Sequence, residues 1–369
     1  MATTNFKGQP VKLIGEFIQV GKVAPDFELV KTDLSSFSLK DLNGKNVILN
    51  IFPSLDTSVC ATSVRKFNKM AAGLKDTVVL AISKDLPFAH ARFCTTEGIE
   101  NVIPLSDFRF SDFDESYGQP QPSLTPYLLE NGEAGRGCVI VCPGGAYMDR
   151  AECESGCIAQ MYRDAGFNAF VLGYRIRPYK YPAQLLDITR AVRVVRYNAE
   201  RWGIDPSHIA ITGFSAGGHL CVMGTELFDG GLGDAAADDI DRVSSRPDAG
   251  ILCYPVVSFL EYVNEGTRDT LLGDSPDPEL LRRLSGEENV PDDMPPIFMW
   301  HTSDDEVVPI ENSLRLALAL RKKEIPFELH VFPHGYHGLG LAESQPDAAQ
   351  WTTLACNWLK TLGFPTADN

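Results

Sequence analysis

The sequence predicts an α/β protein whose mostly parallel, doubly wound sheet follows a smaller α/β segment. Six short apolar stretches between residues 138 and 333 have the length and the flanking Gly, Pro and polar residues of buried strands. Helical periodicity fills most of the intervals between them, and this alternation is typical of a parallel sheet with helices on both faces. A chain of 369 residues is also long enough for two domains.

The smaller segment comes first in the chain. Residues 47–53 and 77–83 are predicted strands, and residues 58–74 between them have a helical pattern, which gives a strand–helix–strand unit. Residues 118–137, rich in Gly and Pro, then interrupt the pattern. The predicted domains are residues 1–118 and 119–369.

In the later segment, predicted strands and helices alternate more regularly. Its clearest helix spans residues 183–202, where apolar residues recur at helical spacing. Its predicted strands are residues 138–143, 169–174, 208–214, 250–255, 297–301 and 327–333.

Charge and composition exclude several classes of partner. The net charge of −16 at pH 7 argues against nucleic acid and anionic membranes, because both repel an acidic surface. No apolar run approaches the roughly 18 residues of a membrane-spanning helix, and the first residues lack the apolar core of a secretory signal. We therefore expect a cytoplasmic protein whose nine cysteines do not form a disulfide framework and are mostly reduced and buried. Cys153 and Cys157 have a metal-ligand spacing, but no His or further Cys lies near them, so we expect no metal site there.

A Gly-x-Ser-x-Gly motif centres on Ser215, with Gly213 before it and Gly217 after it. A predicted strand ends at Thr212 and a helix begins near Ala216, which is the setting of a nucleophile elbow, a sharp turn that exposes a catalytic serine. Small residues must flank that serine, and the two glycines provide them. The alternative is a serine that only caps the following helix. We predict that Ser215 is a nucleophile.

A glycine-containing loop at residues 143–147 lies upstream, directly after a predicted strand. Glycines there let backbone N–H groups approach a developing oxyanion. We predict an oxyanion hole formed by the N–H of Ala216 together with that of Gly145 or Ala146. An ordinary turn at the end of the strand is the alternative.

The acid and the base of a catalytic triad are predicted downstream. Asp305 is our choice for the acid because it stands before Val-Pro with D-x-x-V-P spacing, and the adjacent Asp304 is the alternative. His337 follows the last predicted strand and is the predicted base, with His334 as a supporting loop residue. Ser, then Asp, then His is the chain order of α/β hydrolases.

These residues predict ester hydrolysis. His337 takes the proton of Ser215 as the serine attacks an ester carbonyl, and Asp305 fixes the imidazole tautomer and stabilises its charged form. Water then hydrolyses the acyl-enzyme. Neither a metal nor an organic cofactor is required, and the expected partner is a small-molecule or oligosaccharide ester.

Residues 124–363 resemble bacterial acetyl esterases and acetylxylan-esterase-like α/β hydrolases of the prolyl-oligopeptidase type. The similar stretches cover nearly the whole segment and include VIVCPGGAY, VLGYRIRP, HIAITGFSAGGHL and HTSDDEVVPIENS. The resemblance implies hydrolysis of acyl esters, acetyl foremost, of carbohydrates such as acetylated xylan or xylo-oligosaccharides. Feruloyl esterase activity at the same site is the alternative.

This segment departs from the family pattern in two places. The glycine-rich loop ends in Ala146 instead of a third glycine, and the domain begins abruptly at Leu124, so we expect a shortened antiparallel edge strand. By the same resemblance, residues 261–295 form a small cap over the site, and Tyr147 lines it.

The smaller segment carries a possible redox pair. Cys60 stands at the start of the predicted helix, after Pro53 and Thr57. A helix N-terminus lowers the pKa of a thiol, so Cys60 and Cys94 are candidates for a peroxidatic and a resolving cysteine. Spacing alone leaves two unrelated buried cysteines as an equal alternative.

Residues 1–118 resemble bacterial thiol peroxidase, an atypical two-cysteine peroxiredoxin with a thioredoxin-like fold, through NIFPSLDTSVCATSVRKFN and VVLAISKDLPFAHARFC. That family continues beyond the point matching Gly118, and the missing part carries the arginine of its peroxide site, which neither Arg65 nor Arg109 matches. We therefore predict a partial domain with weak or no peroxidase activity, completed by the hydrolase segment or by a second chain in a homodimer. The alternatives are a bifunctional esterase and thiol peroxidase that uses thioredoxin, or a dimerisation module without chemistry.

Overall fold

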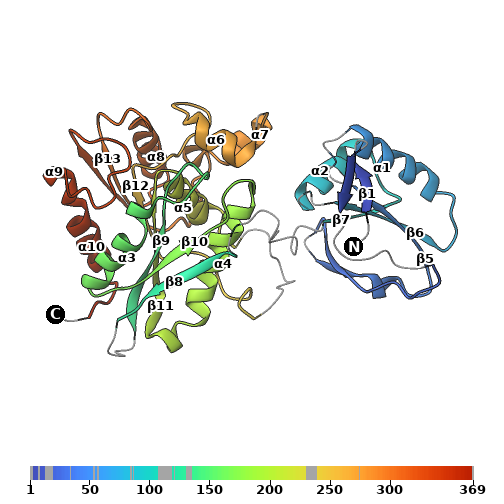
Figure 1. Ribbon diagram of the computed structural model, residues 1–369, viewed down its shortest axis with the longest axis horizontal. Coiled ribbons are helices and arrows are strands. Elements are labelled where there is room, and N and C mark those ends of the chain that lie inside the picture. Colours follow the sequence, from blue (N-terminus) through green and yellow to red (C-terminus); the bar gives the residue numbers. More distant parts are fainter. Residues whose placement is uncertain are drawn as a thin grey trace. The chain divides into compact units, whose positions relative to one another are not determined.

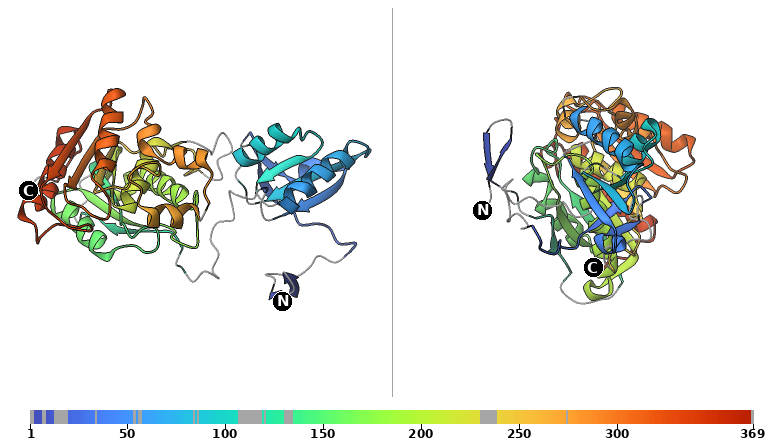
Figure 2. Two further views of the ribbon diagram at one scale, coloured as in Figure 1. Left: turned by 90° about the horizontal axis from the view of Figure 1, so that it is seen from above. Right: turned by 90° about the vertical axis from the view of Figure 1, so that its right-hand side faces the viewer.

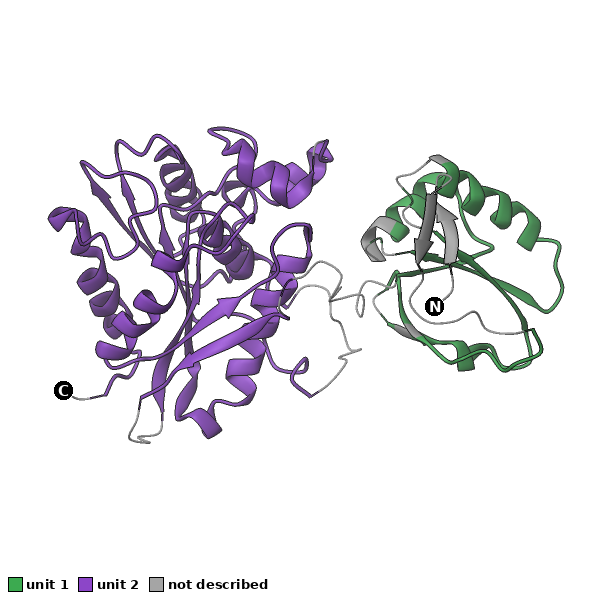
Figure 3. Cartoon of the chain, viewed as in Figure 1, with its two compact units in different colours: residues 1–112 green, residues 113–369 purple. Residues whose placement is uncertain are grey.

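The computed structural model describes residues 3–6, 9–12, 20–33, 35–52, 55, 58–83, 85, 87–106, 119, 121–129, 135–229, 239–273 and 275–367. The chain divides into two compact units, residues 1–112 and 113–369 (Figure 3). Many of the elements of both units are labelled in Figure 1.

The larger unit is built on a seven-stranded sheet with the order β14-β13-β12-β11-β9-β10-β8. Its strands are β8 (Ser123–Tyr127), β9 (Arg136–Cys142), β10 (Asn168–Gly173), β11 (Ile204–Phe214), β12 (Ala249–Cys253), β13 (Ile297–Thr302) and β14 (Phe327–Phe332). β9 to β14 are parallel, and β8 pairs with β10 in the antiparallel direction along all five of its residues. The predicted mostly parallel sheet is confirmed, and the antiparallel edge strand is present.

Both faces of this sheet are covered, which is why its central strands β9, β12 and β13 are buried almost throughout. In β9, Ile140 and Cys142 belong to one apolar core, whereas Val139 and Val141 point to the core on the opposite face. The helices on the first face are α4 (Ala183–Tyr197), α5 (Ala216–Glu226) and α8 (Glu311–Lys322). Those on the second face are α3 (Gly156–Asp164) and α10 (Trp351–Thr361), and Figure 2 shows the layers from two further directions.

Short helices complete this unit. They are η3 (Glu152–Glu154), η4 (Glu200–Trp202), α6 (Glu265–Leu272), α7 (Pro278–Arg283), η5 (Gly286–Glu288) and α9 (Pro346–Ala349). The helix predicted to reach Trp202 ends at Tyr197, because Asn198 caps α4 and Gly203, with φ 66°, ends the short η4 turn that follows.

The sheet places the predicted site residues at one edge. The loop of residues 143–147 follows β9, Ser215 follows β11, Asp305 lies after β13, and His337 lies after β14. The carboxyl ends of parallel strands meet at the same edge of a sheet, where ligand sites of α/β proteins form. Residues far apart in the sequence are therefore brought to one place by topology.

The smaller unit has a five-stranded sheet with the order β4-β3-β7-β6-β5. Its elements are β1 (Thr3–Phe6), β2 (Gln9–Lys12), β3 (Glu28–Lys31), β4 (Ser36–Ser38), η1 (Leu39–Leu42), β5 (Asn46–Ile51), α1 (Ser58–Ala71), β6 (Thr77–Ser83), α2 (Pro87–Glu97) and β7 (Ile103–Ser106). β5, α1 and β6 form the predicted strand–helix–strand unit, with β5 and β6 parallel. β5 is an edge strand of this sheet, and its Leu49 and Ile51 are exposed.

Candidate active site

Ser215 occupies the sharp turn between β11 and α5, with φ 53° and ψ −118°. A positive φ strains a residue that has a side chain, and such strain persists only where neighbouring contacts enforce it. Here the Ser215 N–H donates to the Cys253 carbonyl at 3.0 Å, and the Ser215 carbonyl accepts from the Val256 N–H at 3.1 Å. The neighbouring strand β12 and the loop after it therefore hold the turn. The serine side chain makes no capping bond to α5, which contradicts the helix-cap alternative.

The two glycines of the motif are required by close packing. An added Cβ on Gly213 would lie 2.1 Å from the Gly217 carbonyl oxygen, and one on Gly217 would lie 2.2 Å from the Cys142 carbonyl oxygen. Non-bonded carbon and oxygen atoms do not approach so closely, so any side chain would push β9 and α5 apart. The two glycines of the motif are therefore needed for the elbow to pack tightly against β9.

Ser215, His337 and Asp305 form one hydrogen-bonded chain. His337 Nε2 lies 2.7 Å from Ser215 Oγ, and His337 Nδ1 lies 2.7 Å from Asp305 Oδ2. An ionised carboxylate only accepts, so Nδ1 carries the ring proton and Nε2 is left to accept from the serine hydroxyl. This is the protonation state that a histidine needs to act as a general base.

Asp305 is held through both carboxylate oxygens. Oδ1 accepts from the N–H groups of Val307 and Val308 at 2.9 and 3.0 Å, and Oδ2 faces His337 as well as His301, whose Nε2 is 3.5 Å away. Burial opposes ionisation of this carboxyl, but the hydrogen bonds from His301 and His337 outweigh it and hold the pKa of Asp305 well below its usual range. Asp305 is therefore negatively charged at neutral pH.

The adjacent Asp304 points elsewhere. Its carboxylate lies 2.9 Å from His334 Nδ1 and accepts from the Gly335 N–H at 2.8 Å. The Asp304 and His334 side chains are half or more exposed. The structure therefore joins Asp305, and not Asp304, to His337, while His334 belongs to a surface pair that ties two loops together.

The loop of residues 143–147 runs past the serine. An added Cβ on Gly144 would lie 3.0 Å from Ser215 Cβ, so the loop and the elbow are in contact. Gly145 has φ 117° and Ala146 has φ 52°. Ala146 thus adopts the left-handed conformation without being glycine, at the cost of some strain.

Three backbone N–H groups at this point have no partner. Among the described residues, no hydrogen bond is formed by the N–H groups of Gly145, Ala146 and Ala216. The neighbouring Gly144 N–H, in contrast, donates to Glu154 Oε2 at 2.8 Å. Ala216 is buried and Gly145 and Ala146 are half-buried, and N–H groups removed from water without an acceptor cost free energy, so these groups are available to an anionic ligand. They are the N–H groups that the sequence predicted for an oxyanion hole.

Tyr147 does not line the site, and this expectation was wrong. Its side chain is fully buried, and its hydroxyl lies 2.9 Å from His219 Nδ1. His219 Nε2 lies 2.9 Å from the Leu284 carbonyl oxygen, which can only accept, so Nδ1 accepts from the Tyr147 hydroxyl. Burial lowers the pKa of His219 to about 4, so the ring is neutral at neutral pH.

Residues 261–295 contact two of the elements that carry the site. The Leu284 carbonyl bonds to His219 on α5, and the Asn264 side-chain amide donates to the Val307 carbonyl at 3.1 Å, beside Asp305. The segment expected to be a cap therefore packs against both the serine helix and the acid loop.

Two buried polar residues near the site were missed from the sequence. Glu154 accepts from the Gly144 N–H, and Tyr254 packs its ring against His337 with 5.0 Å between the ring centroids. A single glutamate in a short helix and a tyrosine at a strand end carry no motif, so no sequence signal distinguished them.

The described part of the chain contains no group of three or more His, Cys, Asp or Glu side chains placed to hold a metal ion. Cys157 donates its thiol to the Cys153 carbonyl at 3.0 Å, and both cysteines are free. Among the described residues, no helix is long and apolar enough to span a membrane.

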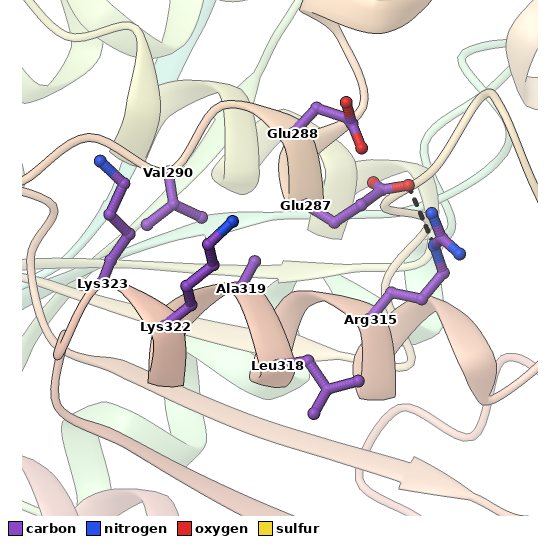
Figure 4. Close-up of a pocket in the computed structure, with 8 residues that line it drawn as sticks. All are labelled: Glu287, Glu288, Val290, Arg315, Leu318, Ala319, Lys322 and Lys323. Carbon is purple, nitrogen blue, oxygen red and sulfur yellow. Dashed lines mark hydrogen bonds and ion pairs between the residues drawn. The ribbon is translucent and has the colours of Figure 1, made fainter.

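A hollow of about 350 Å³ lies between η5 and α8 (Figure 4). The side chains around it are Glu287, Glu288, Val290, Arg315, Leu318, Ala319, Lys322 and Lys323. Arg315 forms an ion pair with Glu287 at 3.1 Å across one end. The hollow has no lining residue in common with the Ser215–His337–Asp305 chain.

In the smaller unit, Cys60 lies in the first turn of α1 and Cys94 in α2, and both pack against the same apolar cluster. Both are free thiols. Burial raises the pKa of Cys94, which disfavours its thiolate. Pro53 and Thr57 lie outside the described residues, so their placement relative to Cys60 is not part of the site geometry.

The structure describes Arg65, one of the two arginines that were compared with the peroxide-site arginine of thiol peroxidases. Arg65 donates two hydrogen bonds to Glu97, at 2.8 and 2.7 Å, in a bidentate ion pair. Its guanidinium is thereby oriented toward Glu97 of α2. Arg109 lies outside the described residues.

The BD-FAE family matches residues 124–320, more than half of the chain. The chain belongs to the BD-FAE family. Among similar proteins, endo-1,4-beta-xylanase B of Butyrivibrio fibrisolvens is 41% identical over 67% of this chain. The match spans only 38% of that longer protein.

Solved structures support the same assignment for the larger unit, which contains the residues that match BD-FAE and is called the BD-FAE unit here. The acetyl ester-xyloside bifunctional hydrolase of Caldicellulosiruptor lactoaceticus is 47% identical with a TM-score of 0.66, covering 70% of this chain and 94% of that one. The carboxylesterase Cest-2923 of Lactobacillus plantarum is 26% identical with a TM-score of 0.58, covering 67% and 94%. The BD-FAE unit is a carboxylic ester hydrolase with the α/β-hydrolase fold, as the sequence predicted.

The Redoxin family matches residues 19–129. Thiol peroxidase of Corynebacterium glutamicum is 58% identical over 32% of this chain, and the match covers 71% of that protein. The BD-FAE unit is therefore preceded by a thioredoxin-like thiol peroxidase domain, as the resemblance implied.

Proposed function

We propose that the larger unit removes acyl groups, acetyl foremost, from carbohydrate esters such as acetylated xylan or xylo-oligosaccharides, with Ser215, His337 and Asp305 as its catalytic triad. One observation carries the proposal. Two hydrogen bonds of 2.7 Å connect the Ser215 hydroxyl through His337 to Asp305. Unpaired N–H groups beside the serine supply the second requirement of acyl transfer, a site for the oxyanion.

The first half of the reaction forms an acyl-enzyme. His337 Nε2 accepts the Ser215 proton as Oγ attacks the ester carbonyl, and the charged imidazole is stabilised by Asp305. The carbonyl oxygen becomes an oxyanion held by the N–H groups of Ala216 and of Gly145 or Ala146. Each such donor is typically worth about 2.7–4 kcal/mol in the transition state. His337 then returns the proton to the sugar oxygen, which leaves as the alcohol.

The second half repeats these steps with water. His337 accepts a proton from a water molecule, whose oxygen attacks the acyl carbon on Ser215 Oγ. The second oxyanion collapses, the serine regains its proton from the imidazolium, and the carboxylic acid leaves. The Ser215 proton that left with the alcohol is replaced by a proton from water, so the triad returns to its starting state and water is the further reactant.

The choice of a carbohydrate ester is supported by the relatives. One is named a xylanase and another an acetyl ester-xyloside hydrolase, and the latter is 47% identical over 70% of this chain. The first name refers to xylan and the second to acetyl esters and xylosides, which together support the acetylated xylan or xylo-oligosaccharides of the sequence prediction. Feruloyl esters are the alternative substrate for the same residues.

A panel of esters run beside Ser215→Ala tests the proposal. We expect the wild-type chain to hydrolyse 4-nitrophenyl acetate faster than the butyrate and to release acetate from acetylated xylo-oligosaccharides. Ser215→Ala should lower each rate at least 1,000-fold, because the acyl-enzyme can no longer form. Activity retained in the variant would refute the triad, and faster turnover of methyl ferulate than of acetyl esters would favour the alternative substrate.

A further inference from the structure

Glu154 is a buried carboxylate that both sides of the site contact. It ends η3, between the oxyanion loop and α3, and only 2% of its surface is exposed. Oε2 accepts from the Gly144 N–H at 2.8 Å, and Oε1 accepts from the Tyr254 hydroxyl at 2.7 Å. A carboxylate is costly to bury, and two well-directed donors make its ionised form tolerable.

Hydrogen-bond accounting favours the ionised form. The Tyr254 oxygen already accepts from the Gly340 N–H at 2.9 Å, so the tyrosine proton must be donated elsewhere. Glu154 Oε1 is the acceptor in position for it. If Glu154 were protonated, its own O–H would face the Gly144 N–H or the Tyr254 O–H, and both of these groups are donors. Burial raises the pKa of Glu154, and the hydrogen bonds from Tyr254 and Gly144 oppose that shift by stabilising the carboxylate.

One end of this network reaches the oxyanion loop. An added Cβ on Gly144 would lie 2.7 Å from Glu154 Oε2, 2.7 Å from the Phe214 carbonyl and 3.0 Å from Ser215 Cβ. The carboxylate and the elbow thus enclose Gly144 from two sides. Because Gly145 and Ala146 follow directly, the position of Gly144 fixes how far their N–H groups lie from the serine.

The other end reaches the histidine. Tyr254 sits at the end of β12 with φ 38°, a strained conformation, and its ring meets that of His337 edge to face with 5.0 Å between centroids. The same tyrosine hydroxyl accepts from Gly340, three residues after His337. An added Cβ on Gly340 would lie 2.5 Å from the Cys153 carbonyl, so η3 also touches this loop directly.

We propose that Glu154 is a positioning residue for ester hydrolysis, holding the oxyanion loop through Gly144 and the ring of His337 through Tyr254. Its negative charge also favours the imidazolium that forms as the serine attacks. The inference rests on the proposed function, because it assigns Glu154 a place in the same reaction.

The negative charge of Glu154 should affect the pH dependence of the rate, which a purely structural residue would leave unchanged. The titratable groups that face Glu154 are Cys153, Tyr174, Cys253, Tyr254 and His337. Burial raises the pKa of both of these cysteines and both tyrosines, so they stay neutral near pH 7. His337 is the group of this set that accepts a proton in the reaction. Removing the carboxylate charge should shift the acid limb of the rate profile to lower pH.

The experiment uses the full chain as wild type, Glu154→Gln, Tyr254→Phe and Ser215→Ala. Hydrolysis of 4-nitrophenyl acetate is measured from pH 5 to 9, and an organophosphate that reacts with the serine counts active sites. Glutamine retains the shape of Glu154 and can still accept from Gly144, but its amide cannot accept the tyrosine proton. Tyr254→Phe retains the carboxylate and removes only its link to the His337 loop.

For Glu154→Gln we expect kcat per active site to fall about tenfold with KM changed less than threefold, and the acid limb of kcat/KM to move to lower pH. Tyr254→Phe should lose a smaller factor in kcat, about threefold or more. Glu154→Gln with kcat within twofold of wild type and an unmoved acid limb would overturn the inference. If Glu154→Gln does not fold, a wild-type kcat in Tyr254→Phe overturns it instead.

The controls separate this inference from the proposed function. An active wild type and an inactive Ser215→Ala leave the triad in place whatever Glu154→Gln does, so a normal Glu154→Gln then counts against the positioning residue alone. A wild type without esterase activity, or an active Ser215→Ala, would overturn both.

Discussion

Replacing Asp305 with asparagine changes the protonation of the whole triad. Oδ1 of residue 305 accepts from two backbone N–H groups, those of Val307 and Val308. An asparagine that retains these bonds must turn its NH₂ toward His337, where Oδ2 now accepts at 2.7 Å. His337 Nδ1 must then accept, which moves the ring proton to Nε2 and points it at Ser215. The base is thereby presented to the nucleophile in the wrong tautomer.

The loss of activity in Asp305→Asn follows from the free energy needed to keep the His337 ring proton on Nδ1, the tautomer that is active. It faces the asparagine NH₂ with its own Nδ1–H, so it loses a hydrogen bond to a charged group, worth about 1.5–3 kcal/mol. It also leaves a buried donor without an acceptor, which costs about 1–3 kcal/mol. A sum near 4 kcal/mol corresponds to a roughly 1,000-fold lower kcat/KM for Asp305→Asn.

The matched control is the neighbouring residue. Asp304→Asn alters a carboxylate that pairs with exposed His334, so we expect kcat/KM within threefold of wild type. Both variants are assayed with 4-nitrophenyl acetate at pH 7.5. All four tryptophans lie between residues 202 and 358, so their fluorescence reports whether the larger unit is folded. Activity of Asp305→Asn within tenfold of wild type, or equal losses in the two variants, would refute the tautomer argument.

Two further predictions concern stability and the smaller unit. Glu226 is buried with Oε1 unpaired among the described residues, and burial, together with nearby Glu287, raises its pKa well above the usual value. The folded chain thus retains a proton that the unfolded chain releases above about pH 4.3, so stability falls as pH rises. Glu226→Gln should add about 1–3 kcal/mol to the free energy of unfolding at pH 8 and less at pH 5, followed by tryptophan fluorescence in urea. A gain independent of pH would contradict this account. For the smaller unit, we expect peroxide reduction with thioredoxin at least 100-fold slower than by an intact thiol peroxidase, because the resemblance to that family implies that the matching residues stop before its peroxide-site arginine. Equal rates, abolished by Cys60→Ser, would show that this arginine is dispensable or supplied from elsewhere.

Much of the fold could be read from local patterns. The apolar runs that predicted strands correspond to β9 to β14, and in the smaller segment β5, α1 and β6 were predicted as a unit. The sequence missed β3, β4 and β7 because they are strands of only three or four residues. Strands so short have no resolvable period, and their pairing depends on neighbours that are distant in the chain.

What the sequence by itself determined was the set of chemical groups and their order along the chain. The glycines around Ser215 predict the nucleophile elbow from the sequence alone, because a tight turn is local and restricts which residues it can contain. The chain order Ser, Asp, His needed only the strand pattern.

Tertiary structure decided which groups meet. Asp304 and Asp305 are adjacent in the chain and alike in chemistry, yet their carboxylates turn to different histidines. Tyr147 turns into the core, and Glu154 bonds both to Gly144 and to Tyr254, which lies 100 residues further along the chain than Glu154. These outcomes depend on the direction of single side chains within a packed interior. That direction is set by close packing and by the pairing of every buried polar group, neither of which has a period or a motif in the sequence.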